Sequence, residues 1–511
     1  MTEQLKDTSN IVETVDAVET VETVETEKAE LPTLLEFTED EILDYEEGQL
    51  DKKDTLKFLL LTPLPHAIAK FSLIGLGLIA AILWLVAALV PSFSQAMVGF
   101  YRGFVTALSA MNNFIPLSMF EVLLIVTALG YIAYFVFILV RFLQKRKTGK
   151  LLSIRYWIQF GYATLAVVMV VTMLFSFGYG LVSNRTSFHA STVSSDGTPL
   201  YDPYLLPNEN EISESMIYLV DKLNTTLINA NSGETQHFFF NETSGASKVN
   251  VNGNRKAKLA KAVSEAFQRA AQDFPQLKGP KLTPKAMLAG PIYNNMTLGS
   301  MYAPATGEVL YNPYFPEVSI PMLVARAIAM ERGFQDEAQA RLIAFFVCTR
   351  YSDVPYIQYS AYMDAYLSTG DKMARCNPHT YATVASALKP EIKREIIYFT
   401  KQLDKLYGNS NSLGFVNNGS QQTSNEDYLV LPELLTGYYR EKLQPVVDAT
   451  IERNCGYYVN SLIALWRQDF EYQTNVTNVI NQYNQYREET TQKTETVTKD
   501  GTAPTNETPA A

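Results

Sequence analysis

The chain has 511 residues, of which 47% are hydrophobic and 19% charged, a composition that suits folded and membrane-embedded sequence and excludes a wholly disordered protein. Its formal net charge of −11 comes from residues 1–54, where 18 acidic residues face 4 lysines, so the other 457 residues carry a net charge of +3. This distribution excludes the basic domain typical of nucleic-acid-binding proteins, and three cysteines exclude a disulfide-rich scaffold or a four-cysteine zinc module.

The two ends of the chain are polar and are predicted to be disordered. Residues 1–54 are acidic and repeat Val-Glu-Thr at 18–26, with too few apolar side chains to offset the entropy lost on ordering. This tail is either a docking segment for a basic partner or, as the simpler interpretation, a solvated spacer. Residues 488–511 are rich in Thr, Glu, Lys and Pro and resemble the first tail in this respect.

Residues 55–183 contain three long apolar runs, at 71–90, 122–140 and 157–182. Each run is close to the ~20 residues that a helix needs to cross the hydrocarbon of a bilayer. We therefore expect an α-helical membrane anchor with three transmembrane helices. Residues 101–120 are less apolar and are predicted to lie at the membrane interface.

The orientation of the anchor follows from its basic residues. The segment between the second and third runs has no acid and holds Arg141, Lys145, Arg146, Lys147, Lys150 and Arg155. Basic loops stay in the cytoplasm, so the N-terminus is predicted to be cytoplasmic and the C-terminal domain extracytoplasmic. The expected location is the cell membrane, as a multi-pass protein.

Residues 184–487 are predicted to form the folded extracytoplasmic domain, mainly α with a small β-hairpin. Apolar residues recur at helical spacing over 212–227 and 259–267, and further helices are expected at 320–332, 336–350, 355–368 and from Pro390. Residues 301–311 indicate two short strands joined by a turn at Thr306-Gly307. Gly333 stands where a residue that ends a helix is expected.

Histidine placement limits metal chemistry. The chain has four histidines, and no two of them lie at the spacing that ligands on one helix or loop need. No His-Glu-x-x-His motif is present. We therefore expect no metal site built from neighbouring residues and no cofactor.

Several segments agree in order and spacing with one known family. They are Phe114-Ile-Pro-Leu-Ser118, the hairpin with Thr306-Gly307-Glu308, residues 333–348 and residues 355–362. Together they resemble a bacterial family of membrane-anchored, zincin-like proteins of unknown function, related to metallopeptidases, over roughly residues 60–445. The resemblance implies a zincin-like, α+β extracytoplasmic domain with a helix that carries the HExxH motif.

The chain departs from that family at the motif itself. Where His-Glu-x-x-His would stand, the sequence has Arg326-Ala327-Ile328-Ala329-Met330, and Gln339 occupies the position that the resemblance implies for a third ligand. In a zincin the two histidines hold zinc and the glutamate activates its water. Arginine stays protonated and cannot replace a ligand. The resemblance therefore implies a degenerate site with no catalytic residue and no metal.

A salt bridge is the expected replacement for the metal. Arg326 is predicted to pair with Glu337 or, as the second choice, with Asp336. The alternative is a rebuilt active site, for which Glu331 and Arg341 are further candidates. Met330 is expected to be core packing and Cys348 a buried thiol, while Cys376 and Cys455 could pair outside the cell.

The helix expected at 355–368 carries a stripe of four tyrosines. Tyr356, Tyr359, Tyr362 and Tyr366 follow helical spacing and are expected to form a partly buried face with hydroxyls at the rim.

The preferred function is a pseudo-metallopeptidase that acts as a cell-surface binding or scaffolding module, with the lipid bilayer and an envelope protein or peptide as partners. The alternative is an active cell-envelope hydrolase with a rebuilt, non-HExxH site.

Overall fold

In the computed structural model, the described residues are 67–145, 150–186, 188, 207–231, 237–295, 298–406 and 458–466. Both predicted tails, 1–54 and 488–511, lie outside these residues. Cys455 also lies outside them, so its predicted pairing with Cys376 stays a prediction, and Cys376 is exposed.

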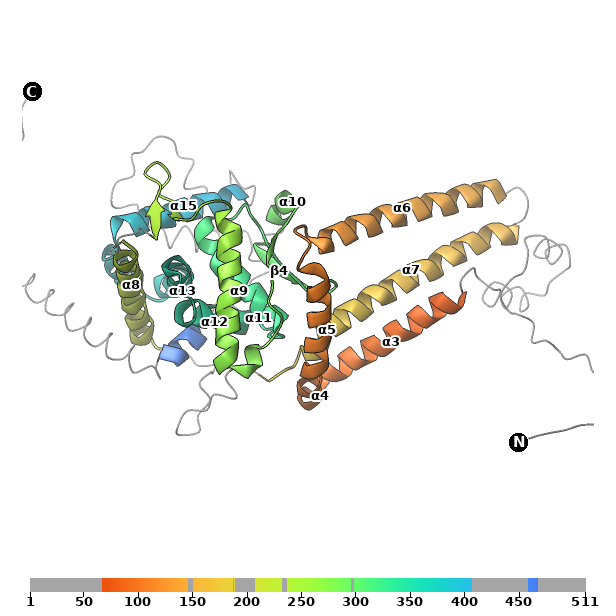
Figure 1. The fold of residues 1–511 in the computed structure, drawn as a ribbon, viewed down its shortest axis with the longest axis horizontal. Coiled ribbons are helices and arrows are strands. Elements are labelled where there is room, and N and C mark those ends of the chain that lie inside the picture. The colour runs from red at the N-terminus through yellow and green to blue at the C-terminus, as the bar shows by residue number, and fades with distance from the viewer. Residues whose placement is uncertain are drawn as a thin grey trace, which may run out of the picture. The chain divides into compact units, whose positions relative to one another are not determined.

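Three helices are long and apolar enough to cross a membrane, as the three apolar runs predicted (Figure 1). They are α3 (Ala67–Leu89), α6 (Met119–Lys145) and α7 (Lys150–Gly178), and the apolar stretches are 69–89, 119–144 and 157–182. At about 1.5 Å per residue, each stretch reaches the ~30 Å thickness of bilayer hydrocarbon. Residues 138–162 belong to the smaller of two compact units, and within this range the Trp157 ring lies edge-on to Phe142.

The segment predicted to be interfacial is helical but is not a span. Between α3 and α6 lie α4 (Pro91–Ala96) and α5 (Val98–Asn112). Tyr101, Val105 and Ser109 recur every four residues on α5 and are all buried. The buried face of α5 packs against the folded domain, which accounts for the amphipathic pattern of this helix.

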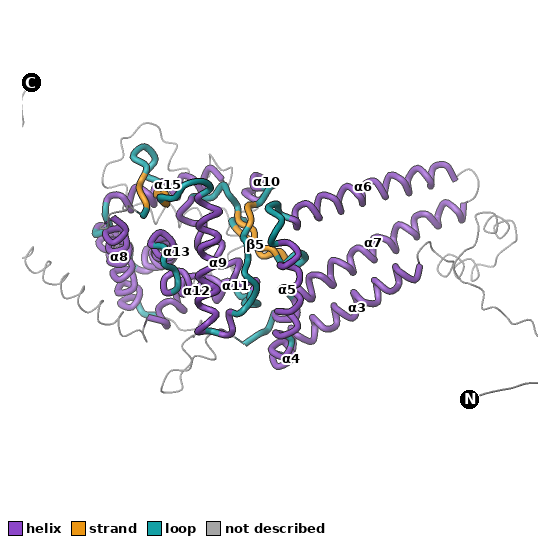
Figure 2. Tube along the Cα trace, viewed as in Figure 1, coloured by secondary structure: helices purple, strands orange, loops and turns teal. Residues whose placement is uncertain are grey.

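The folded domain is mainly helical, with two small sheets (Figure 2). Its helices are α8 (Glu209–Asn231), α9 (Arg255–Asp273), α10 (Gly290–Asn295), α11 (Ile320–Glu331), α12 (Glu337–Arg350), α13 (Pro355–Cys376), α14 (Pro378–Ser386) and α15 (Pro390–Leu406). Single 3-10 turns are η1 (Gly180–Val182), η3 (Pro275–Leu277) and η4 (Glu317–Ser319). One apolar core joins α8, α9, α11, α12 and α13, so the mainly helical fold agrees with the prediction.

The strands are short. Strands β1 (Phe238–Phe240) and β2 (Ser247–Val249) form one antiparallel pair. In the second sheet, β5 (Glu308–Tyr311) lies between β3 (Lys285–Ala286), which runs parallel to it, and β4 (Ser300–Ala303), which runs antiparallel. The hairpin predicted at 301–311 is confirmed as β4 and β5.

The tip of the β4–β5 hairpin contacts the ends of three helices of the anchor region. Gly307 has a φ of +66°, and a Cβ there would lie 2.9 Å from Ser109 Oγ on α5. Tyr302 donates a hydrogen bond to the Gly178 carbonyl at the end of α7. Only glycine suits position 307, because it combines a left-handed conformation with close backbone approach.

Glu308 joins this hairpin to α6. Its carboxylate accepts hydrogen bonds from the backbone N–H groups of Met119 and Phe120, at 3.1 and 2.8 Å, in the first turn of α6. Lys285 Nζ lies 2.5 Å from the same carboxylate, and both side chains are only 3% exposed. A carboxylate is favourable at this point because the first N–H groups of a helix have no partner within the helix.

A second buried pair lies under α5. Glu331 and Arg332, at the end of α11, form a 2.8 Å ion pair with both side chains 1% exposed. Tyr101 of α5 donates to the Glu331 carbonyl at 2.7 Å, so this pair also supports the contact between α5 and the domain. Burial raises the pKa of Glu331 to about 7, while Arg332 opposes the shift. Gly333 follows with a φ of +91°, which confirms it as the residue that ends the helix.

The tyrosine stripe is more deeply buried than the sequence indicated. Tyr356, Tyr359 and Tyr366 are at most 1% exposed, so the prediction that their hydroxyls lie at the rim was wrong. The Tyr359 hydroxyl donates to Glu395 of α15 at 2.5 Å, and Tyr356 bonds to Ser247. Each of the three buried hydroxyls has a partner from another segment, Glu395 for Tyr359, Ser247 for Tyr356 and Tyr381 for Tyr366, which helical spacing alone could not reveal.

We expect Glu308→Ala to destabilise the protein by about 3–5 kcal/mol, because Lys285 would be left buried without its counter-charge. Thermal unfolding of the full chain in detergent should show a Tm lower by several degrees. Glu265→Ala, whose side chain is 42% exposed, is the control and should change little. The double variant Lys285→Met, Glu308→Leu should recover part of the loss. A double variant no more stable than Glu308→Ala would contradict this account.

Stability should also depend on pH through Glu395. Burial raises the pKa of this carboxyl from 4.5 to about 7. The folded chain therefore binds more protons than the unfolded chain between these values, so the free energy of unfolding should fall as pH rises through this window. Glu395→Gln should make the decrease in Tm between pH 4.5 and 7 smaller, and an unchanged slope would refute the assignment. Glu331→Gln should reduce the slope separately.

Candidate functional site

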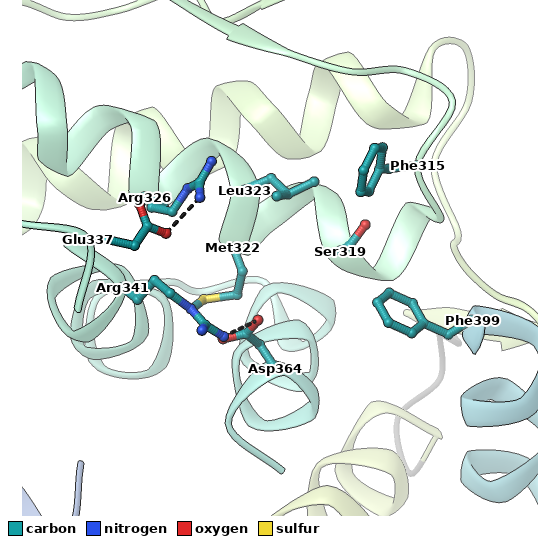
Figure 3. Close-up of a pocket in the computed structure, with 9 residues that line it drawn as sticks. All are labelled: Phe315, Ser319, Met322, Leu323, Arg326, Glu337, Arg341, Asp364 and Phe399. Atoms are coloured by element: carbon teal, nitrogen blue, oxygen red, sulfur yellow. Dashed lines mark hydrogen bonds and ion pairs between the residues drawn. The ribbon is translucent and has the colours of Figure 1, made fainter. Parts of the chain in front are cut away.

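A cavity of about 210 Å³ lies in the folded domain, between α11, α12, α13 and α15 (Figure 3). Its lining residues are Phe315, Ser319, Met322, Leu323, Arg326, Glu337, Arg341, Asp364 and Phe399. The volume lies below the roughly 300–1,000 Å³ of pockets that hold drug-sized ligands. It suits one side chain or one chain terminus.

Helix α11 contributes one face to the cavity. Ser319, Met322, Leu323 and Arg326 follow the three- and four-residue spacing that places side chains on the same side of a helix. Pro321 starts the helix without loss of an internal hydrogen bond, because the first N–H groups are unpaired in any helix. The opposite face, with Ala325 and Ile328, is completely buried in the core.

Helix α12 brings two charged residues to the cavity. Asp336 is the N-cap of this helix, and its carboxylate accepts a hydrogen bond from the Gln339 N–H at 2.8 Å. Glu337 and Arg341 follow at i and i+4, so they lie on one face and both line the cavity. The cap therefore fixes the start of α12 and the direction of the Glu337 side chain.

Arg326 and Glu337 form an ion pair across the cavity wall. Arg326 Nη1 lies 2.6 Å from Glu337 Oε1, with the side chains 22% and 26% exposed. The Nη2 atom donates to the carbonyl and hydroxyl of Ser300 on β4. Arg326 Nε is buried and has no hydrogen-bond partner among the described residues. The Nε donor is therefore unused by the part of the chain that the structure describes.

A second ion pair lies beside the first. Arg341 Nη2 donates to both carboxylate oxygens of Asp364 on α13, at 3.1 and 2.9 Å, and to Ser368. The guanidinium also lies over the Tyr458 ring, 4.2 Å from its centre. These contacts hold Arg341 in one orientation.

The remaining wall is apolar. Phe315 and Phe399 lie on the side of the cavity away from the two ion pairs, with Leu323 between the aromatic and charged ends (Figure 3). The cavity thus has an aromatic end and a charged end. This arrangement suits an amphipathic group, with an apolar body and a charged terminus.

The structure separates the residues singled out in the sequence. Arg326 and Glu337 line the cavity, whereas Asp336 serves as a helix cap. Ala327 is completely buried, and Met330 packs between two apolar clusters, as expected for core packing. Gln339 is 7% exposed and does not line the cavity. Of these four positions, only Arg326 therefore lines the cavity.

Two other predictions have clear outcomes. Cys348 is a fully buried thiol, as predicted, and burial raises its pKa. Glu331, a candidate for a rebuilt site, faces Arg332 and not Arg326. Within the described ranges, no three His, Cys, Asp or Glu side chains are close enough together to hold a metal ion.

Most residues that line the cavity were not predicted from the sequence. Asp364 and Phe399 come from helices that are distant in sequence, and Phe315 lies before α11, so no helical pattern joins these residues to Arg326. Helical spacing could have predicted two further lining residues. Ser319 and Met322 precede Arg326 at the seven- and four-residue spacing of one helix face.

Comparison with known proteins gives one match. Residues 97–431 match the sequence profile of a family described as a protein of unknown function (DUF3810). No curated protein and no solved structure matches the chain. The matched range extends from the start of α5 beyond α15, so it includes the β4–β5 hairpin and every lining residue of the cavity.

We expect Arg326 and Glu337 to be energetically coupled. Arg326→Ala and Glu337→Ala should each lower the free energy of unfolding, and the double variant should lose less than their sum by about 1–2 kcal/mol. Arg326→Ala should cost more, because it also removes the bonds to Ser300. Thermal unfolding of the four proteins in detergent measures the coupling.

A second cycle provides the control. Asp353 is 82% exposed and pairs with Arg269, so Asp353→Ala should add independently to Arg326→Ala. Additive losses in the cycle with Glu337 would show that the ion pair contributes no coupling.

Proposed function

Because the chain belongs to the family described as a protein of unknown function (DUF3810), we propose a function from the cavity: a membrane-anchored binding protein that holds the end of a peptide. In this proposal the domain is a non-catalytic relative of the membrane metallopeptidases that the sequence resembles. The observation that carries it is the cavity itself, which joins an aromatic end to a charged end with an unused Arg326 donor.

The charged end favours binding over hydrolysis. Arg326 stands at the first motif position and is held by Glu337 and Ser300, while Arg341 is held by Asp364. Guanidinium groups stay protonated and cannot act as general bases. Each guanidinium is paired with one carboxylate, so the four charges sum to zero, and a ligand carboxylate would accept from Arg326 without displacing either ion pair.

The aromatic end favours a ligand with an apolar side chain. Phe315, Leu323 and Phe399 form a wall that a ring or branched side chain could contact. The cavity volume of about 210 Å³ limits this contact to a single residue. The proposed ligand is therefore a peptide whose last residue is apolar and whose free carboxylate meets Arg326.

Location is part of the proposal. The basic segment 141–156 favours a cytoplasmic loop, which would place the cavity outside the cell. A peptide or an exposed protein end in the cell envelope is then the partner. A rebuilt hydrolase site is the weaker candidate, because the four charged side chains of the cavity are engaged in two ion pairs.

The test uses N-acetyl-L-phenylalanine and, as its uncharged match, N-acetyl-L-phenylalaninamide. Calorimetric titration of the full chain in detergent should detect the carboxylate and give at least tenfold weaker binding for the amide, since a hydrogen bond to a charged group contributes about 1.5–3 kcal/mol.

Two variants test the role of Arg326. Arg326→Gln should weaken binding of the carboxylate about tenfold or more, and Arg326→Lys should restore little, because it keeps the charge without the Nε donor. Equal binding of the acid and the amide, or full affinity in Arg326→Gln, would refute the proposal. A change in the stability of a variant does not affect this test, because the ratio of acid to amide affinity is measured within one protein.

A further inference from the structure

Four large apolar side chains are exposed where the folded domain meets α6. Phe114 and Leu117 lie in the loop before α6 and are 78% and 52% exposed, while Leu288 and Ile292 lie at α10 and are 49% and 64% exposed. We propose that these four residues, the apolar rim, insert into the lipid bilayer beside α6. The domain would then contact the membrane through residues that belong to none of the three spans.

Hydrogen bonds hold the two halves of the rim together. Asn113 donates to the Lys281 carbonyl and accepts from the Thr283 N–H, at 2.8 and 3.1 Å. Lys285 Nζ then donates to the Leu117 carbonyl at 3.0 Å. The segment before α10 therefore runs beside the loop before α6, and Figure 1 shows α10 next to the beginning of that helix.

Glu121 fixes the depth of Leu288. Glu121 lies in the first turn of α6, and its carboxylate accepts hydrogen bonds from the backbone N–H groups of Leu288 and Ala289 at 2.7 and 2.8 Å. Leu288 is therefore level with the first turn of a spanning helix.

The length of α6 places that turn at the membrane interface. Its apolar stretch has 26 residues, which rise about 39 Å and exceed the ~30 Å of hydrocarbon. A carboxyl side chain is costly within hydrocarbon, so the excess length belongs in part at this end and puts Glu121 at the headgroup boundary. The rim reaches the same level through its bonds to α6.

A bilayer is the occupant that this position favours. Leu123 and Leu124, two and three residues after Glu121 on α6, are 45% and 52% exposed, so the rim lies beside a surface that would face lipid. Single exposed apolar residues are ordinary on soluble surfaces, but a continuous group at the edge of a membrane span is not. Apolar side chains at the interface gain from burial among acyl chains.

The test is a measurement of depth by spin labelling. Cysteines at Ile292→Cys and Leu288→Cys are introduced separately, in a full chain whose Cys376 and Cys455 are serine and whose buried Cys348 remains. The labelled proteins are placed in phosphatidylcholine nanodiscs. Collision with oxygen, which concentrates in lipid, is compared with collision with a water-soluble nickel chelate.

Ile228→Cys is the matched control, because Ile228 has a similar exposure of 51% and lies on α8. We expect the oxygen-to-nickel collision ratio at 292 and 288 to exceed that at 228 several-fold. Nickel access at 292 equal to that at 228 would show a solvated rim and overturn the proposal. Low access of both reagents would show coverage by protein, such as a second copy, and would overturn it as well.

Discussion

The carboxylate of Glu308 connects the membrane helices to the folded domain. It accepts from the first N–H groups of α6 and pairs with Lys285, and neither side chain reaches solvent. Such a buried charge is tolerable only when every partner is in place, so the hairpin, the start of α6 and β3 must assemble together. Glu121 adds a second bond of the same kind in the opposite direction, from α6 to the backbone before α10.

The same hairpin also positions the cavity. Strand β5 carries Glu308 at one end, and its antiparallel partner β4 begins at Ser300, which accepts two hydrogen bonds from Arg326. Arg326 in turn pairs with Glu337 on α12. A continuous series of polar contacts therefore runs from the first turn of a spanning helix to the charged end of the cavity. The rigidity of a short, fully paired hairpin keeps the two ends of this series in fixed positions.

Local pattern was sufficient for much of this architecture. Long apolar runs predicted the spans, because a bilayer tolerates little else, and Thr306-Gly307 predicted the hairpin turn, because position 307 needs a left-handed backbone. The tyrosine stripe shows the limit of such reasoning. Helical spacing predicted a shared face, but the depth of that face depended on Glu395 and Ser247, which come from other elements and satisfy the hydroxyls in the core.

The sequence by itself determined the three long apolar runs, the helices around Arg326 and Glu337, and the absence of an HExxH motif, since each depends on residues close together in the chain. Only the tertiary structure decided which of these residues share a cavity. It placed Arg326 and Glu337 together with Asp364 and Phe399, and it put Gln339 outside. The physical reason is that spacing fixes the face of a helix, whereas the packing of one helix against another decides what that face meets.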